Sequence, residues 1–139
     1  MEKTDSRYRH FVQILREELV PAMGCTEPIA IAYGAAKARE VLGCLPERML
    51  VEASGNIIKN VKSVVVPNTG GLKGISAAAA AGAVAGDPGK ILEVISTVTE
   101  GQKAEIRDYL ARCEIRVKPA PGDVVFDVIL TLWAGEDSV

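Results

Sequence analysis

The stretch from Gly74 to Gly86 limits what this chain can fold into. Its 13 residues carry no charge and are mostly alanine and glycine. A helix that spans a bilayer needs about 20 apolar residues, so this stretch is too short to cross a membrane. We expect residues 75–85 to form an alanine-rich helix with almost no side-chain bulk. Such a helix lets neighbouring backbone or a ligand approach closely, so the stretch predicts a close contact with another part of the protein.

A second apolar helix is expected over about residues 27–42. Its first half, residues 29–36, is apolar on every side, which indicates burial all round. Charged residues begin at Lys37 and bring the second half to the surface, and Gly43 is a natural helix stop. The end of this helix that carries Cys25 is therefore expected to be its buried end.

The remaining pattern alternates helices with strands. We expect helices over about residues 5–19, 87–97 and 100–112, and strands over residues 49–53, 61–66, 114–118 and 124–133. The last two strands are expected to pair as a hairpin. A chain of 139 residues has the length of one domain. The sequence thus predicts a single α+β (mixed α/β) domain, with helices packed on a small mixed sheet and a C-terminal antiparallel hairpin.

Charge and composition exclude several classes of function. The net charge of −2 gives no basic field for nucleic acid, and aromatic residues, at 4%, are too few for base-stacking platforms. The three cysteines are widely spaced and form no CxxC pair, which disfavours a disulfide framework and favours a reducing cytoplasm. The charged residues 1–10 contain no apolar signal core. We therefore expect a cytoplasmic protein without nucleic-acid or membrane partners.

Cys25 is the first candidate functional residue. It lies in a turn bounded by proline and glycine, just before an expected helix for which Thr26 is a good N-cap. Helix starts present unpaired N–H groups and positive potential, which favour a thiolate that binds a metal or attacks an electrophile. The alternative is a small buried hydrophobic residue, as most free cysteines are. Cys44 and Cys113 stand in contexts that favour a structural role.

Two polar stretches are candidates for ligand binding. The glycine loop of residues 67–74 exposes backbone N–H groups that can hold an anion, to which Thr69 and Lys73 can add donors. It carries no nucleotide-binding fingerprint, so a small carboxylate fits it better than a triphosphate. The alternative is a loop that only needs positive φ and a close helix contact. In residues 54–56 small polar groups interrupt a strand, which either places donors in a pocket or merely forms a turn.

Three motifs follow one another along the chain. They are PAMGCTEP at residues 21–28, SGNIIKN at residues 54–60, and PNTGG at residues 67–71, ahead of the alanine-rich helix and residues 86–88. In this order they closely resemble the amino-terminal half of the L-cysteine desulfidase family, which is related to the alpha chain of iron–sulfur-dependent L-serine dehydratase. The resemblance runs from the first helix to the last hairpin. It implies that residues 1–139 are the amino-terminal part of a longer or split iron–sulfur lyase.

The resemblance also implies a chemistry. Members of that family are lyases with a [4Fe–4S] cluster held by three cysteines, and they convert L-cysteine to sulfide, ammonia and pyruvate through an aminoacrylate. By resemblance, Cys25 is one cluster ligand, and the amino-acid pocket is lined by Ser54, Gly55, Asn56, Asn60, Thr69, Gly70 and Gly71. The candidate bases for the α-proton are Lys62, Lys73 and Glu27, and the sequence does not choose between them. It does not choose between L-cysteine and L-serine as substrate either.

Full-length members of that family are longer, and their other cluster cysteines lie in the carboxy-terminal part. We therefore expect a carboxy-terminal half or partner subunit that completes the site, and a chain that alone holds no cluster and turns over no substrate. A homo-oligomer is compatible with this expectation. The alternatives are a non-catalytic amino-acid-binding module, which needs no thiolate at Cys25, and a structural or subunit-interaction domain.

Overall fold

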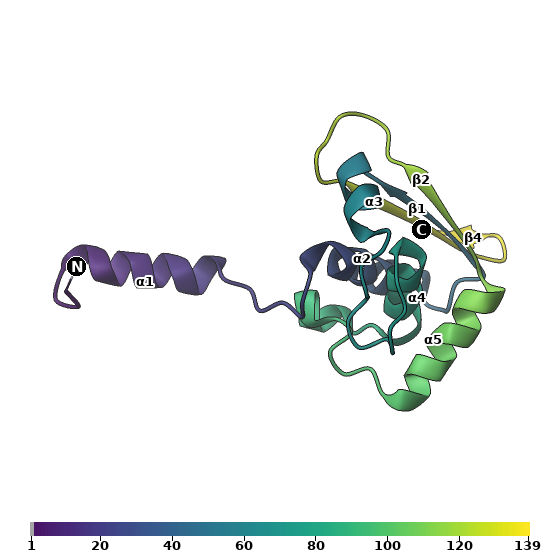
Figure 1. Ribbon diagram of the computed structural model, residues 1–139, viewed down its shortest axis with the longest axis horizontal. Helices are drawn as coiled ribbons and strands as arrows, with labels where there is room; N and C mark the ends of the chain where they lie inside the picture. Colours follow the sequence, from purple (N-terminus) through teal and green to yellow (C-terminus); the bar gives the residue numbers. More distant parts are fainter. Residues whose placement is uncertain (1) are drawn as a thin grey trace.

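The structure, a computed structural model, describes residues 2–139. The helices are α1 (Ser6–Glu18), α2 (Thr26–Leu42), α3 (Gly55–Val61), α4 (Ile75–Ala85), the 3₁₀ helix η1 (Pro88–Glu93) and α5 (Glu100–Arg112). The strands are β1 (Arg48–Ala53), β2 (Glu114–Pro119), β3 (Val128–Ala134) and β4 (Asp137–Ser138). In Figure 1 the helices α2 to α5 and the sheet form one body, and α1 projects away from it. The predicted α+β class is confirmed.

Strand β1 lies inside the mixed sheet, whose strand order is β2-β1-β3-β4. Strand β2 runs parallel to β1, and β3 runs antiparallel to β1 on its other side. The prediction that the strands near residues 114–118 and 124–133 pair with each other is therefore wrong, because β1 lies between them. The C-terminal antiparallel hairpin is formed by β3 and β4 instead. A parallel pair such as β1 and β2 needs a long crossover connection, and here helices α3 to α5 provide it.

The alanine-rich helix α4 lies in the core. Residues 77–83 are all buried, and α2 crosses α4 so closely that a Cβ added to Gly82 would overlap the backbone carbonyl of Ala32. The close approach predicted from the sequence is thus a contact between the backbones of two helices. The larger buried side chains come from the elements around this crossing: Ile29, Ile31, Met49, Val51, Ile57, Ile106 and Leu132.

Two predicted elements take other forms. Residues 61–66 do not form a strand of the sheet, because the chain turns back at Gly70 and Gly71 and makes its bonds within the loop. The loop contains a single bridge between Val65 and Lys73. The helix expected over residues 87–97 is the shorter η1, whose N-cap Asp87 accepts a hydrogen bond from the backbone N–H of Gly89 at 3.0 Å.

Helix α1 is amphipathic, as predicted, but none of its residues is buried. Its apolar stripe includes Phe11 and Leu15, each more than half exposed, and Leu19 beyond its end is exposed further. The stripe therefore takes no part in the core of the body. None of the helices described in residues 2–139 is long and apolar enough to cross a membrane.

Candidate functional site

The turn that carries Cys25 leads directly into α2. Gly24 has a φ of 83°, and a Cβ at this position would lie 3.1 Å from Pro67 of the glycine loop. Cys25 itself, rather than Thr26 as predicted, is the N-cap, and its side chain makes no capping hydrogen bond. Cys25 is exposed. The prediction of a buried helix end is wrong for the thiol, because burial in α2 begins only at Pro28.

Glu27 and Asn60 form a polar cluster with Cys25, called here the Cys25 cluster. The Sγ atom of Cys25 lies 3.9 Å from Oε2 of Glu27, and Nδ2 of Asn60 donates a hydrogen bond to Oε1 of Glu27 at 2.9 Å. Glu27 belongs to the first turn of α2, where the helix dipole favours a carboxylate. Asn60 comes from α3. The structure thus joins the first two sequence motifs at one exposed position.

A cavity of about 240 Å³ lies beside the first turn of α3. It is lined by residues 54–56 and by residues 122–125, a loop that the sequence did not mark as part of a site. Ser54 is buried, and its Oγ donates to the backbone carbonyl of Val125 at 2.8 Å. The Ser54 hydroxyl therefore holds the loop that closes one side of the cavity.

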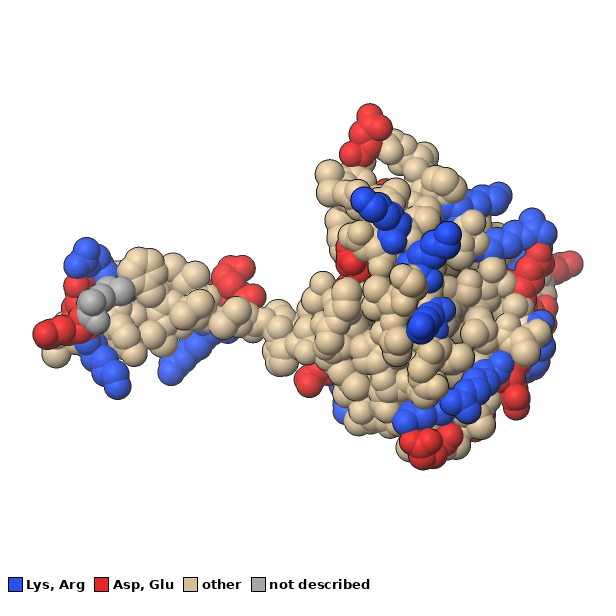
Figure 2. All heavy atoms as spheres, viewed as in Figure 1, with Lys and Arg blue, Asp and Glu red and all other residues tan. Residues whose placement is uncertain are grey.

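The surface of α3 links this cavity to the Cys25 cluster. Asn56 and Asn60 are four residues apart, so they lie on the same face of the helix. Both are exposed, and so is Lys59. Figure 2 shows Lys and Arg side chains over α3 and the middle of the body, while many Asp and Glu side chains lie toward its rim. A small anionic ligand fits the charge of this face better than a cationic one.

The glycine loop is held by hydrogen bonds of its own side chains. Asn68, with a φ of 55°, donates its amide to three backbone carbonyls of residues 95–98 at distances of 3.0–3.2 Å. Thr69 is fully buried, and its Oγ1 donates to the carbonyl of Val66 at 2.7 Å. The hydroxyl hydrogen of Thr69 is thus used inside the turn, and a role for Thr69 in binding stays a prediction.

The tip of the loop consists of Gly70 and Gly71, with φ values of 71° and 92°. The expected positive φ is confirmed, and glycine adopts it without steric cost. Arg107 of α5 donates to the carbonyl of Gly70 at 3.3 Å, and a Cβ on Gly70 would overlap its guanidinium. Arg107 was not among the sequence candidates, since nothing in a surface helix marks the arginine that meets a distant loop. Anion binding at the tip stays a prediction.

The two candidate lysine bases are exposed. Lys62 follows α3 as its C-cap, and its carbonyl lies 3.5 Å from the position of a Cβ on Gly74, directly after Lys73. Within residues 2–139, no hydrogen bond or ion pair joins either lysine to the Cys25 cluster. Of the three candidate bases, the structure brings Glu27 to Cys25.

The three cysteines do not converge on one metal site. Cys25 and Cys44 flank opposite ends of the 17-residue α2, whose axial rise is about 25 Å. Cys113 donates to the carbonyl of Glu47 at 3.3 Å, and burial raises the pKa of its thiol. In the part of the chain described, no three His, Cys, Asp or Glu side chains gather as metal ligands. The residues of this chain therefore do not by themselves fit a [4Fe–4S] cluster.

The three cysteines should differ in their rates of alkylation. We expect Cys113 to react several-fold more slowly near neutral pH than the exposed Cys25 and Cys44, because Cys113 is partly buried, the thiolate is the reactive form and burial raises the pKa of Cys113. Raising the pH should increase the rate at Cys113, since a larger fraction of its thiol, whose pKa is raised, is then ionised. Peptide mapping by mass spectrometry measures the three rates. Equal rates across the pH range would contradict the placement of Cys113.

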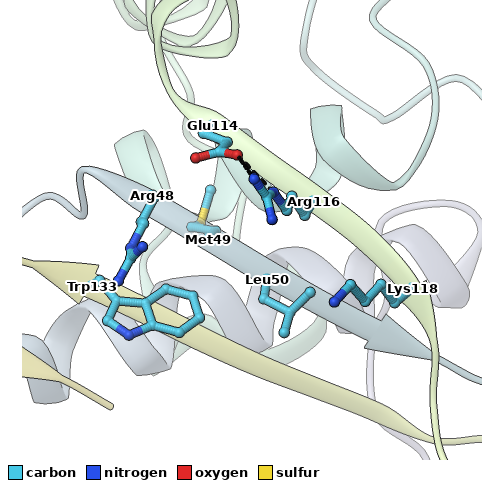
Figure 3. A pocket seen from close by; sticks show the side chains of 7 residues that line it. All are labelled: Arg48, Met49, Leu50, Glu114, Arg116, Lys118 and Trp133. Carbon is cyan, nitrogen blue, oxygen red and sulfur yellow. Dashed lines mark hydrogen bonds and ion pairs between the residues drawn. The ribbon is translucent and has the colours of Figure 1, made fainter.

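A second depression, of about 220 Å³, lies on the sheet face opposite the helices (Figure 3). Three of its four charged side chains, all but Lys118, already have partners. Arg48 stacks over Trp133 at 4.6 Å from the ring centroid, and Arg116 pairs with Glu114. None of the residues predicted from the motifs lines this depression. The candidate site is therefore the Cys25 cluster together with the cavity at Ser54.

Comparison with known proteins gives the relatives of this chain. It is 59% identical over 133 residues to a UPF0597 protein of Desulfitobacterium hafniense (strain Y51), a match that covers 96% of this chain and 31% of that protein. It is 53% identical over 118 residues to a UPF0597 protein of Treponema denticola, covering 85% of this chain and 27% of the relative. The chain is a homologue of part of the UPF0597 proteins. It spans about a third of the length of these UPF0597 relatives.

The names of these UPF0597 proteins state no activity, substrate or cofactor, and they mention neither L-cysteine desulfidase nor L-serine dehydratase. No protein-family model and no solved structure matches the chain. Relationship to the UPF0597 proteins is thus established, and the desulfidase resemblance remains a prediction.

Proposed function

We propose that this chain is one part of a UPF0597 protein that acts as an L-cysteine desulfidase, releasing sulfide, ammonia and pyruvate from L-cysteine. The observation that supports it most is the meeting of the motifs. Asn60 of the second motif bonds to Glu27 of the first, and Gly24 of the first motif packs against Pro67 of the third. Motifs that lie far apart in the sequence and meet at one exposed place are typical of a shared site.

In this proposal Cys25 is a single ligand of an iron–sulfur cluster. It is exposed, so its thiolate is accessible to a cluster whose other ligands come from the remaining polypeptide or from a partner subunit. Because Cys25 is the only cysteine in the Cys25 cluster, the other two cysteine ligands of such an iron–sulfur cluster have to come from outside the described residues.

Glu27 is the proposed base for the α-proton. Asn60 holds Oε1 of Glu27 by a hydrogen bond, while Oε2 lies toward Cys25. The hydrogen bond from Asn60 fixes one oxygen of the carboxylate and leaves the other on the side of Cys25 to accept a proton, as a general base does. Lys62 and Lys73 remain alternatives if substrate binding brings either lysine closer.

The amino-acid substrate is proposed to lie along α3. Its carboxylate would interact with the exposed amides of Asn56 and Asn60 and with the positive charge of Lys59. The cavity beside residues 54–56 has room for a small amino acid. L-Serine is a second candidate substrate on the same chemistry, and a direct comparison of the two amino acids decides the preference.

The test uses a complete polypeptide. The chain replaces the matching segment of the D. hafniense relative, and the fusion protein is purified without oxygen and supplied with iron and sulfide. We expect visible iron–sulfur absorbance together with sulfide and pyruvate release from L-cysteine. The substitution Cys25→Ala should remove both signals. The matched substitution Cys44→Ala, at an exposed cysteine beyond the other end of α2, should keep both.

Two results would reject the proposal. One is a folded fusion protein that stays colourless and inactive while the unmodified D. hafniense relative is also inactive. The other is equal loss on Cys25→Ala and Cys44→Ala, which would mean that Cys25 has no special role. Heat of binding for L-cysteine without turnover would favour the amino-acid-binding module.

A further inference from the structure

The two outer edges of the sheet differ in how they resist pairing with another strand. Edge strand β2 has charges at Glu114, Arg116 and Lys118 and ends at Pro119, features that discourage strand addition. The other edge is formed by the first part of β3, because β4 pairs only with the last residues of β3. Residues 128–131 of β3, with the sequence VILT, contain no charge and no proline. Only this second edge is without protective residues.

The open edge presents backbone groups that are ready to pair. Leu132 and Val139 exchange both of their backbone hydrogen bonds, at 3.0 and 3.1 Å. Bonding directions alternate along an antiparallel strand, so Leu130 and Val128 direct their N–H and C=O groups to the same side as Leu132, away from β1. The bond from Ser54 N–H to the carbonyl of Asp127, at 2.9 Å, fits this alternation. Within residues 2–139, β4 pairs only with the far end of β3.

An apolar groove of about 340 Å³ lies beside this edge. One wall is α2, with Tyr33, Gly34, Lys37, Ala38 and Val41, and the other is formed by Leu130 and Val139. Val41 is 69% exposed in the chain alone. Residues that pair across a sheet point their side chains to the same face. A residue paired with Leu130 would therefore direct its side chain into this groove.

We propose that the open edge of β3 binds an extended strand from the polypeptide that the UPF0597 relatives carry outside the matched segment. The added strand runs antiparallel to β3, in line with β4, and bonds with Leu130 and Val128. An apolar side chain opposite Leu130 fills the groove. Such a strand has a source in the same polypeptide, because the match covers only 31% of the D. hafniense relative. Main-chain bonds plus a side-chain pocket are the usual basis of strand addition, and the proposal does not depend on the lyase activity.

Amide hydrogen exchange tests this docking. The chain alone is compared with the fusion protein in which it replaces the matching segment of the D. hafniense relative. We expect the amides of Val128 and Leu130 to exchange at least about tenfold more slowly in the fusion protein, because they gain hydrogen-bond partners there. The amides of Ile129 and Thr131 face β1 and serve as internal references that are protected in both. Equal exchange of Val128 and Leu130 in the two proteins would overturn the proposal.

Two substitutions make the test specific. Val41→Asp should abolish the added protection in the fusion protein while leaving the chain alone unchanged, since it places a charge in the groove. Val20→Asp, at a residue that is 49% exposed and does not line the groove, should keep the protection. Protection that appears in the chain alone and rises with its concentration would identify a second copy as the occupant and overturn the proposed source. If the fusion protein misfolds, the same edge amides are measured in the D. hafniense relative itself, where rapid exchange would overturn the proposal.

Discussion

Gly82→Ala is expected to lower the free energy of unfolding by about 3 kcal/mol or more, at the upper end of what overpacking costs. The added Cβ would overlap the backbone carbonyl of Ala32, and no flexible side chain is available to move aside. Helices α2 and α4 would have to separate, and both belong to the core. Urea denaturation followed by circular dichroism measures the effect.

A matched glycine provides the control. Gly101 lies in α5, and the atom nearest to an added Cβ is Oγ1 of Thr99 at an ordinary 3.9 Å. Gly101→Ala should therefore stabilise the protein by about 0.5–1 kcal/mol through the lower backbone entropy cost of alanine in a helix. Similar effects at Gly82 and Gly101 would show that the backbone contact between α2 and α4 is not present.

Asn68→Ala is expected to cost about 2–3 kcal/mol, from lost hydrogen bonds and from backbone strain. The substitution removes the side-chain donor of three carbonyls of residues 95–98, of which, in the described part of the chain, only that of Ile95 keeps a backbone donor, the N–H of Val98. It also places alanine at a φ of 55°, which asparagine tolerates better. Urea denaturation gives the stability, and hydrogen exchange over residues 66–74 shows whether the glycine loop loosens.

Asn68→Gly separates the two causes. Glycine keeps the positive φ without strain but makes none of the three hydrogen bonds. We expect it to recover about 1 kcal/mol of the loss, the approximate cost of a left-handed conformation for alanine. If both variants are as stable as the original chain, Asn68 does not clamp the loop to residues 95–98.

The four longer helices were predictable because their signals are local, whereas α3 was not predicted and the helix expected over residues 87–97 is the shorter η1. Residues 75–85 and 100–112 form helices with the predicted bounds, since glycine, threonine and charged residues mark where each begins and ends. Strand pairing was not predictable in the same way. The alternation in residues 114–118 identifies a strand but does not say that its neighbour is β1, which is contributed by a distant part of the chain. The valines of residues 61–66 favour a strand, yet the turn at Gly70 and Gly71 determines their partners.

In the candidate site, too, the individual residues were predictable from the sequence, and the contacts between them were not. The motifs named Cys25, Glu27 and Asn60 as candidates, but the hydrogen bond between Glu27 and Asn60 depends on how α2 and α3 pack. The exposure of Cys25 was missed because burial was expected along the whole first half of α2, including its N-cap. Burial in fact begins at Pro28, about one helical turn later. The internal bond of Thr69 was missed because a hydroxyl in a glycine loop is equally suited to a ligand and to the turn itself.

The crossing of α2 and α4 also determines how the candidate site can move. The Cys25 turn precedes α2, and the glycine loop precedes α4. At Gly82 and Ala32 the two helices touch through their backbones, so no layer of side chains between them can deform. Sliding of one helix along the other would require the two backbones to part. The Cys25 turn and the glycine loop are therefore attached to one rigid pair of helices. Adjustment to a ligand is limited to the side chains and the loop tips at the N-terminal ends of α2 and α4.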